Sequence, residues 1–242
     1  MPALLLIAHG SRDPRHAATV AALVEEVRAQ RPGVEVVTAY LDHCAPRIPQ
    51  VVGRLADAVA VPLLLNRAFH AKHDIPAALR AAGSRLPVAE VLGPSPLLLA
   101  ALERRLAEAG LDVSSPAVRA RTGVVLAAAG SSDPAADAAT RAVAAEWRRS
   151  RGWAAVEVAY ASAAGPRVPD ALAALRAAGA ERTAVSPYLL APGLLPDRIA
   201  AAAAGADVLA DVLGPAPELA TLLLHRHDEA RHAERPAPAL TA

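Results

Sequence analysis

Two stretches of sequence decide the fold: LLLIAHGSRDP at residues 4–14 and VVLAAAGSSDP at residues 124–134. The second repeats the pattern of the first, and the position that holds His9 returns 120 residues later (129 − 9) as Ala129. Each stretch joins an apolar run to an Asp-Pro pair, which is typical of a buried strand followed by a helix, because Asp caps a helix start and Pro suits its first turn. The chain therefore contains this strand–turn–helix unit twice.

Two further pairs of segments repeat in the same order. TAYLDHCAPRIP at residues 38–49 returns as VAYASAAGPRVP at residues 158–169. VLGPSPLL at residues 91–98 returns as VLGPAPEL at residues 212–219. Three matched blocks in one order predict a duplicated domain.

Within each copy, apolar runs of about five residues alternate with longer helical patterns, which is typical of a parallel sheet covered by helices. We expect an α/β fold in which each copy forms a small parallel sheet of four strands with helices on both faces. The copies are predicted at residues 1–115 and 120–225, with a linker at 111–123 and a flexible tail at 226–242. In the first copy, the predicted strands are ALLLIA, VEVVTAY, AVAVPLLL and VAEVLG, and the predicted helices begin at Pro14, at residue 47, at Ile75 and at Pro96.

The composition excludes several classes of protein. The 25 basic and 24 acidic residues leave a net charge of +1, which is unlike a nucleic-acid-binding surface. The apolar runs all fall short of the roughly 20 residues that a membrane helix needs. The single cysteine, Cys44, rules out an internal disulfide. We therefore expect a cytoplasmic protein with neither nucleic-acid nor membrane partners.

Candidate metal ligands follow three predicted strands of the first copy. His9 ends the first strand, Asp42 follows the second, and His70 follows the third by a few residues. Parallel α/β sheets bind ligands beyond the carboxyl ends of their strands, where loops leave the rigid sheet. Imidazole suits Fe, Co, Ni and Zn, and a carboxylate adds charge. The sequence therefore predicts a divalent-metal site at this edge of the first copy.

All three candidate ligands are replaced in the second copy, by Ala129, Ser162 and Leu195. The surrounding motifs are retained, so this pattern indicates that one copy reacts while the other shapes the cleft. A lone histidine at a strand end is more often a hydrogen-bonding residue than a ligand. The prediction therefore rests on the joint loss of the whole set.

Polar and basic residues beside these ligands predict a site for anionic groups. The SRDP turn presents main-chain amides at a helix start, and Arg or Lys side chains neutralise acids. The predicted substrate-binding residues are Ser11, Arg12, Arg67, Lys72 and His73. The alternative for the basic members is a solvated rim.

The motifs LLLIAHGSRDP, YLDHCAP and above all VPLLLNRAFHAKHDIP resemble the sirohydrochlorin chelatase family, the ATP-independent class II chelatases in their long two-domain form. The resemblance covers roughly residues 3–225. It implies insertion of Co²⁺ or Fe²⁺, with Ni²⁺ as a further candidate, into the tetrapyrrole sirohydrochlorin in cobalamin or sirohaem biosynthesis. The family's two active-site histidines fall on His9 and His70, and its acidic metal-site residue falls on Asp42, where relatives can carry Glu.

Metal insertion requires partial dehydration of the ion and loss of two pyrrolic protons, and neutral imidazoles at His9 and His70 can serve both needs. We expect no nucleotide, since neither GxxxxGK[ST] nor a convincing GxGxxG occurs. We expect a monomer, with a homodimer as the alternative.

Other functions stay open from the sequence. A non-catalytic metal or tetrapyrrole carrier is the main alternative. A histidine phosphatase would carry Arg before the histidine, where this chain has Ala8, and a Ser11 hydrolase would need GxSxG.

Overall fold

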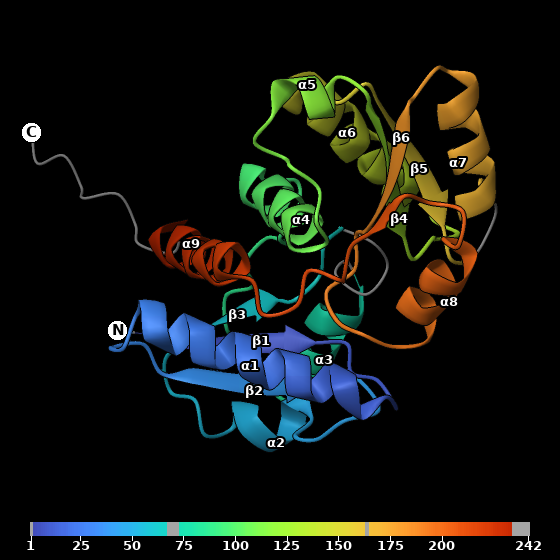
Figure 1. Ribbon diagram of the computed structural model, residues 1–242. Helices are drawn as coiled ribbons and strands as arrows, with labels where there is room; N and C mark the ends of the chain where they lie inside the picture. The colour runs from blue at the N-terminus through green and yellow to red at the C-terminus, as the bar shows by residue number, and fades with distance from the viewer. Residues whose placement is uncertain (1, 67–72, 163–164, 234–242) are drawn as a thin grey trace, which may run out of the picture.

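The computed structural model describes residues 2–66, 73–162 and 165–233, and it shows two α/β halves stacked on one another (Figure 1). The strands are β1 (Ala3–Ala8), β2 (Val36–Tyr40), β3 (Ala58–Pro62), β4 (Thr122–Ala128), β5 (Ala155–Tyr160), β6 (Arg182–Pro187) and β7 (Val208–Leu209). The helices are α1 (Pro14–Gln30), α2 (Ile48–Val52), α3 (Ile75–Ala81), α4 (Pro96–Glu108), α5 (Pro116–Arg119), α6 (Pro134–Arg151), α7 (Val168–Ala177), α8 (Leu194–Ala202) and α9 (Pro217–Ala233).

The two sheets are parallel and equivalent in topology. Their strand orders are β2-β1-β3 and β5-β4-β6-β7, so the first strand of each repeat lies in the middle. The predicted Asp caps are present: Asp13 accepts from the Arg15 amide and Asp133 from the Ala135 amide, each at 2.9 Å. The predicted α/β fold built from two duplicated units is therefore confirmed.

The prediction of four strands per copy is wrong for the first copy. In the described part of its sheet, the fourth run makes only an isolated bridge between Val88 and Ala60. The Ala60 amide donates to Pro87 and the Ala89 amide to Ala60, each at 2.8 Å. In the second copy the same segment pairs through two residues, Ala184 with Val208 and Val185 with Leu209, and so forms β7.

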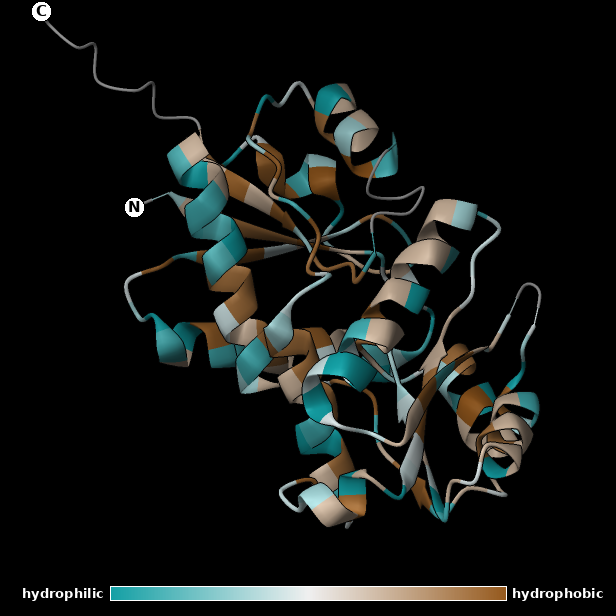
Figure 2. Ribbon diagram, turned by 90° about the horizontal axis from the view of Figure 1, so that it is seen from above, coloured by the Kyte–Doolittle hydropathy of each residue, from teal (hydrophilic) through white to brown (hydrophobic). Residues whose placement is uncertain are grey.

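Alternate residues of each central strand enter different cores. Leu4 and Leu6 of β1 join a cluster that runs through the whole molecule and includes Val124 and Leu126 of β4. Leu5 packs instead in a separate cluster with residues of the outer helices α2 and α3. Apolar residues accordingly concentrate on the strands and inward helix faces, as the hydropathy colouring shows (Figure 2). The two halves therefore share one continuous inner core.

The last helix of each repeat packs against the sheet of the other repeat. α4 ends the first repeat but lies beside β6, and α9 ends the second repeat but lies against α1 and β3 (Figure 1). Arg105 on α4 donates to the Leu213 carbonyl, and Arg226 on α9 donates to the Leu92 carbonyl. The repeats are thus joined by an exchange of helices that their sequence boundaries do not reveal.

This exchange corrects the prediction of a flexible tail from residue 226. Residues 226–233 continue α9, and His227 is completely buried, with Nε2 3.1 Å from the Pro2 carbonyl. Residues 234–242 lie outside the described part of the chain. Of the predicted linker at 111–123, residues 116–119 form α5, capped by the Ser115 side chain. None of the described helices combines the length and apolar composition that a membrane crossing requires.

Candidate functional site

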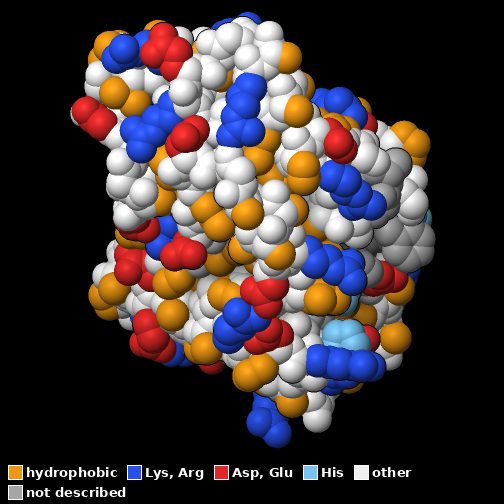
Figure 3. Space-filling view, turned by 45° about the vertical axis from the view of Figure 1, so that its right-hand side comes forward, with side chains coloured by type: hydrophobic (Ala, Val, Ile, Leu, Met, Phe, Trp, Pro, Cys, Tyr) orange, Lys and Arg blue, Asp and Glu red, His pale blue; other side chains and the backbone are white. Residues whose placement is uncertain are grey.

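A cleft of about 440 Å³ lies between the two halves at the carboxyl ends of their central strands. Its walls come from both repeats, including the turn after β1, the matching turn after β4, and residues 188–196 after β6. Acidic and basic side chains are interspersed over the face seen in Figure 3, in keeping with the balanced net charge. The cleft is therefore the concave site that both halves build together.

His9 enters this cleft directly after β1. Its ring is half buried, with Nδ1 3.1 Å from the Gly10 carbonyl oxygen. Gly10 has φ +90°, and a Cβ there would lie 1.7 Å from the Asp42 carbonyl oxygen. Only glycine allows this turn to press against the 42–44 loop, where Cys44 Sγ donates to the Ser11 carbonyl at 3.1 Å. The close approach fixes the direction in which His9 leaves the strand.

The main chain of Asp42 lies beside His9, because the Asp42 amide donates to the His9 carbonyl at 2.8 Å. Its carboxylate accepts from the His43 amide at 2.9 Å and pairs with Arg47 at 2.9 Å. These two bonds, the amide first, hold the pKa of Asp42 below its ordinary value. Asp42 is exposed and is absent from the described lining of the cleft. The carboxylate is thus engaged by His43 and Arg47, and its role as a metal ligand stays a prediction.

The remaining predicted residues are divided between the cleft, the surface and the part that is not described. Ser11 lines the cleft, while Arg12 and His73 are exposed. His70, Arg67 and Lys72 lie outside the described residues. Within the described ranges, no three His, Cys, Asp or Glu side chains gather closely enough to hold one metal ion. The pairing of His9 with His70 thus stays a prediction.

His16 is a cleft residue that the sequence analysis did not select. It lies on the first turn of α1 and lines the cleft, and its ring centroid is 6.4 Å from that of Tyr40. Burial, and then the nearby His9, lower the pKa of His16, which favours its neutral form. Its Nδ1 is buried without a hydrogen-bond partner in the described structure. Its position in the first turn of α1, directly after the Asp13 cap, could have indicated this location, because both α1 and α6 begin at the cleft.

The second half adds polar side chains of its own. The hydroxyl of Tyr160 donates to the Asp137 carboxylate, and both residues line the cleft. Burial and this bond raise the pKa of Tyr160 to about 12. Thr140 accepts from Asn66 Nδ2 at 2.9 Å and so joins the two walls. The second copy has lost the predicted ligands, but its wall is not purely apolar.

Comparison with known proteins agrees with this arrangement. A sirohydrochlorin ferrochelatase from Priestia megaterium is 29% identical over 93% of this chain and 89% of its own length. A sirohydrochlorin cobaltochelatase from the same organism is 26% identical over 97% of this chain and 81% of its own. The solved structure of SirB from Bacillus subtilis with Fe³⁺ shares the fold, with a TM-score of 0.79, 24% identity and 96% of both chains covered.

The CbiX family model matches twice, at residues 3–109 and 123–230. The two matches correspond to the two repeats and together span most of the sequence, so the chain belongs to the CbiX family.

Proposed function

We propose that this protein is a sirohydrochlorin chelatase that inserts a divalent metal ion, Co²⁺ or Fe²⁺, into sirohydrochlorin. The observation that carries the proposal is the double family match, together with chelatase relatives that cover nearly the whole chain. The described site supports this proposal, because His9 lines a cleft whose walls come from both repeats. We further propose that the protein acts without a nucleotide, as a cytoplasmic monomer, and that Ni²⁺ is a third candidate substrate.

The chemistry requires an acceptor for two protons. The metal ion and the free tetrapyrrole give the metallated tetrapyrrole and two H⁺, with no change in oxidation state. A neutral imidazole at His9 can replace a water molecule on the ion and accept a pyrrolic proton. We propose that His70 is its partner, with Ser11, Arg12, Arg67, Lys72 and His73 around the peripheral acids of the substrate.

Anaerobic metallation assays test this function. Purified protein with sirohydrochlorin and Co²⁺ or Fe²⁺ should speed the absorbance change of metallation above the uncatalysed rate, with Ni²⁺ run in parallel. His9→Ala should remove most of that gain. His232→Ala is the matched control, since His232 is exposed on α9 and its Nδ1 lies 2.6 Å from the Asp228 carbonyl oxygen.

Binding of the tetrapyrrole without any acceleration would identify a carrier instead of an enzyme. Equal rates for the wild type and His9→Ala would contradict the assignment of His9.

A further inference from the structure

The hydroxyl of Tyr188 is a buried donor that the fold leaves unused. Tyr188 directly follows β6, and its side chain is only 2% exposed. Its hydroxyl has no hydrogen-bond partner among the residues that the structure describes. The same residue lines the cleft that His9 enters from the other half. An unpaired polar group of this kind is uncommon in a folded protein and calls for a partner.

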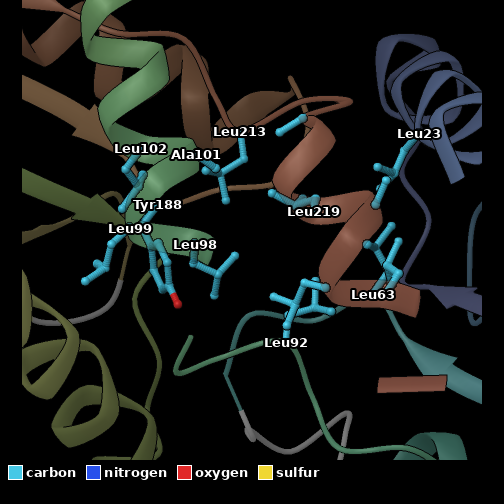
Figure 4. Packing of buried hydrophobic residues seen from close by; sticks show 14 of the residues in the cluster. Leu23, Leu63, Leu92, Leu98, Leu99, Ala101, Leu102, Tyr188, Leu213 and Leu219 are labelled. Atoms are coloured by element: carbon cyan, nitrogen blue, oxygen red, sulfur yellow. The ribbon is translucent and has the colours of Figure 1, made fainter. Parts of the chain in front are cut away.

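The surroundings of the phenol place it at the junction of the two halves. A Cβ on Gly93, in the first repeat, would lie 2.8 Å from the Tyr188 hydroxyl and 3.4 Å from Leu98. Figure 4 shows the ring among the leucines of α4, with the hydroxyl oxygen at its outer end. The ring is thus held by packing against α4, and its hydroxyl lies against Gly93 at the junction of the two repeats.

The repeat itself shows that packing does not require the hydroxyl. β3 and β6 both end in proline, and the residue after Pro62 is Leu63 where Tyr188 follows Pro187. Leu63 is also buried and also lines the cleft. The first copy therefore fills this position with a purely apolar residue, Leu63. The second copy carries a buried hydroxyl there, that of Tyr188. Burial raises the pKa of Tyr188, so the group keeps its proton near neutral pH.

We propose that Tyr188 is a substrate-binding residue whose hydroxyl donates a hydrogen bond to a carboxylate oxygen of the tetrapyrrole in the cleft. This inference rests on the proposed function. A neutral donor held in an apolar wall pairs best with an ionised acceptor, and the peripheral acids of the substrate provide one. The macrocycle is then held between His9 of the first half and Tyr188 of the second, so the second repeat takes part in recognition.

The test is Tyr188→Phe, which removes one oxygen atom and keeps the ring. Titration of metal-free sirohydrochlorin, followed by absorbance, should show binding weakened about tenfold, as for the loss of a hydrogen bond to a charged group. KM for the tetrapyrrole should rise while kcat changes little. The Tm of the free protein should stay equal or increase, because an unpaired buried hydroxyl has been removed.

Tyr40→Phe is the matched control. Tyr40 ends β2, is 6% exposed and is not among the described residues of the cleft wall, so its variant should bind sirohydrochlorin like the wild type. Unchanged affinity in Tyr188→Phe would overturn the proposal and indicate that an internal water molecule satisfies the phenol. A lowered Tm with unchanged affinity would also overturn it and assign a structural role. If the wild type does not bind sirohydrochlorin at all, the proposed function fails, and this inference fails with it.

Discussion

Arg105 on α4 donates through Nη2 to the main-chain carbonyl of Leu213, 2.8 Å away, and so fastens the last helix of the first repeat to the second repeat. The counterpart 121 residues later (226 − 105), Arg226 on α9, donates to the carbonyls of Val91 and Leu92. The two contacts are equivalent, since each joins the last helix of one repeat to a main-chain carbonyl of the other repeat. Each half of the molecule therefore depends on a helix from the other repeat for part of its inner core.

This exchange makes a prediction about two equivalent leucines. Leu102 on α4 and Leu223 on α9 occupy matching repeat positions and are both 0% exposed. Replacing either with Ala should lower the free energy of unfolding by about 2–5 kcal/mol, through lost burial and the remaining cavity. Amide hydrogen exchange should then speed up most in β3 for Leu223→Ala and in β6 for Leu102→Ala. Each variant serves as the control for the other, and the reverse pattern would contradict the exchange of helices.

Gly10 and Gly179 provide a matched pair for the turn that directs His9. Their φ angles are +90° and +89°, but only at Gly10 would a Cβ meet another backbone atom, at 1.7 Å. Gly179→Ala should cost about 1–2 kcal/mol through strain alone. Gly10→Ala should cost about 1–3 kcal/mol more because the two loops must separate. Urea unfolding gives both values, and equal losses would show that the close approach at Gly10 is unimportant.

Asp42 tests whether a carboxylate outside the described cleft wall takes part in metal binding. Asp42→Asn keeps the size of the side chain but removes the charge that pairs with Arg47. If the carboxylate ligates the ion, KM for the metal should rise at least about tenfold, as for other losses around a metal site. Arg47→Met is the companion variant, because it frees the carboxylate and should leave KM unchanged or lower. Unchanged KM in Asp42→Asn would remove this residue from the proposed ligand set.

His16 should make part of the stability depend on pH. Burial lowers its pKa below the ordinary value of 6.5, so the unfolded chain binds the proton more readily than the folded protein. Its contribution is therefore fully present above about pH 6.5 and is lost as the pH falls toward the folded pKa. His16→Gln should reduce the loss of unfolding free energy as the pH falls through this range. Urea unfolding at several pH values measures that loss. His225→Gln, on the exposed side of α9, should keep the wild-type slope, and an equal slope in both variants would contradict the assignment.

Much of the site could be found from local patterns. The Asp-Pro pair predicted the starts of α1 and α6, because capping is decided within one turn of the chain. The end of the first apolar run located His9 in the cleft, because parallel strands bring their carboxyl ends to one edge. His16 and Tyr188 were not found, since each owes its place to packing against distant segments.

The sequence by itself determined the duplication, the parallel sheets and the strand end that presents His9, because periodicity and capping act between residues close together in the chain. Tertiary structure alone decided which sheet each terminal helix covers and that Asp42 pairs with Arg47. The physical reason is that α4 and α9 come from matching repeat segments, so their local patterns cannot distinguish one sheet from the other. Only the shape of the shared core and the reach of the connecting segments select the partner.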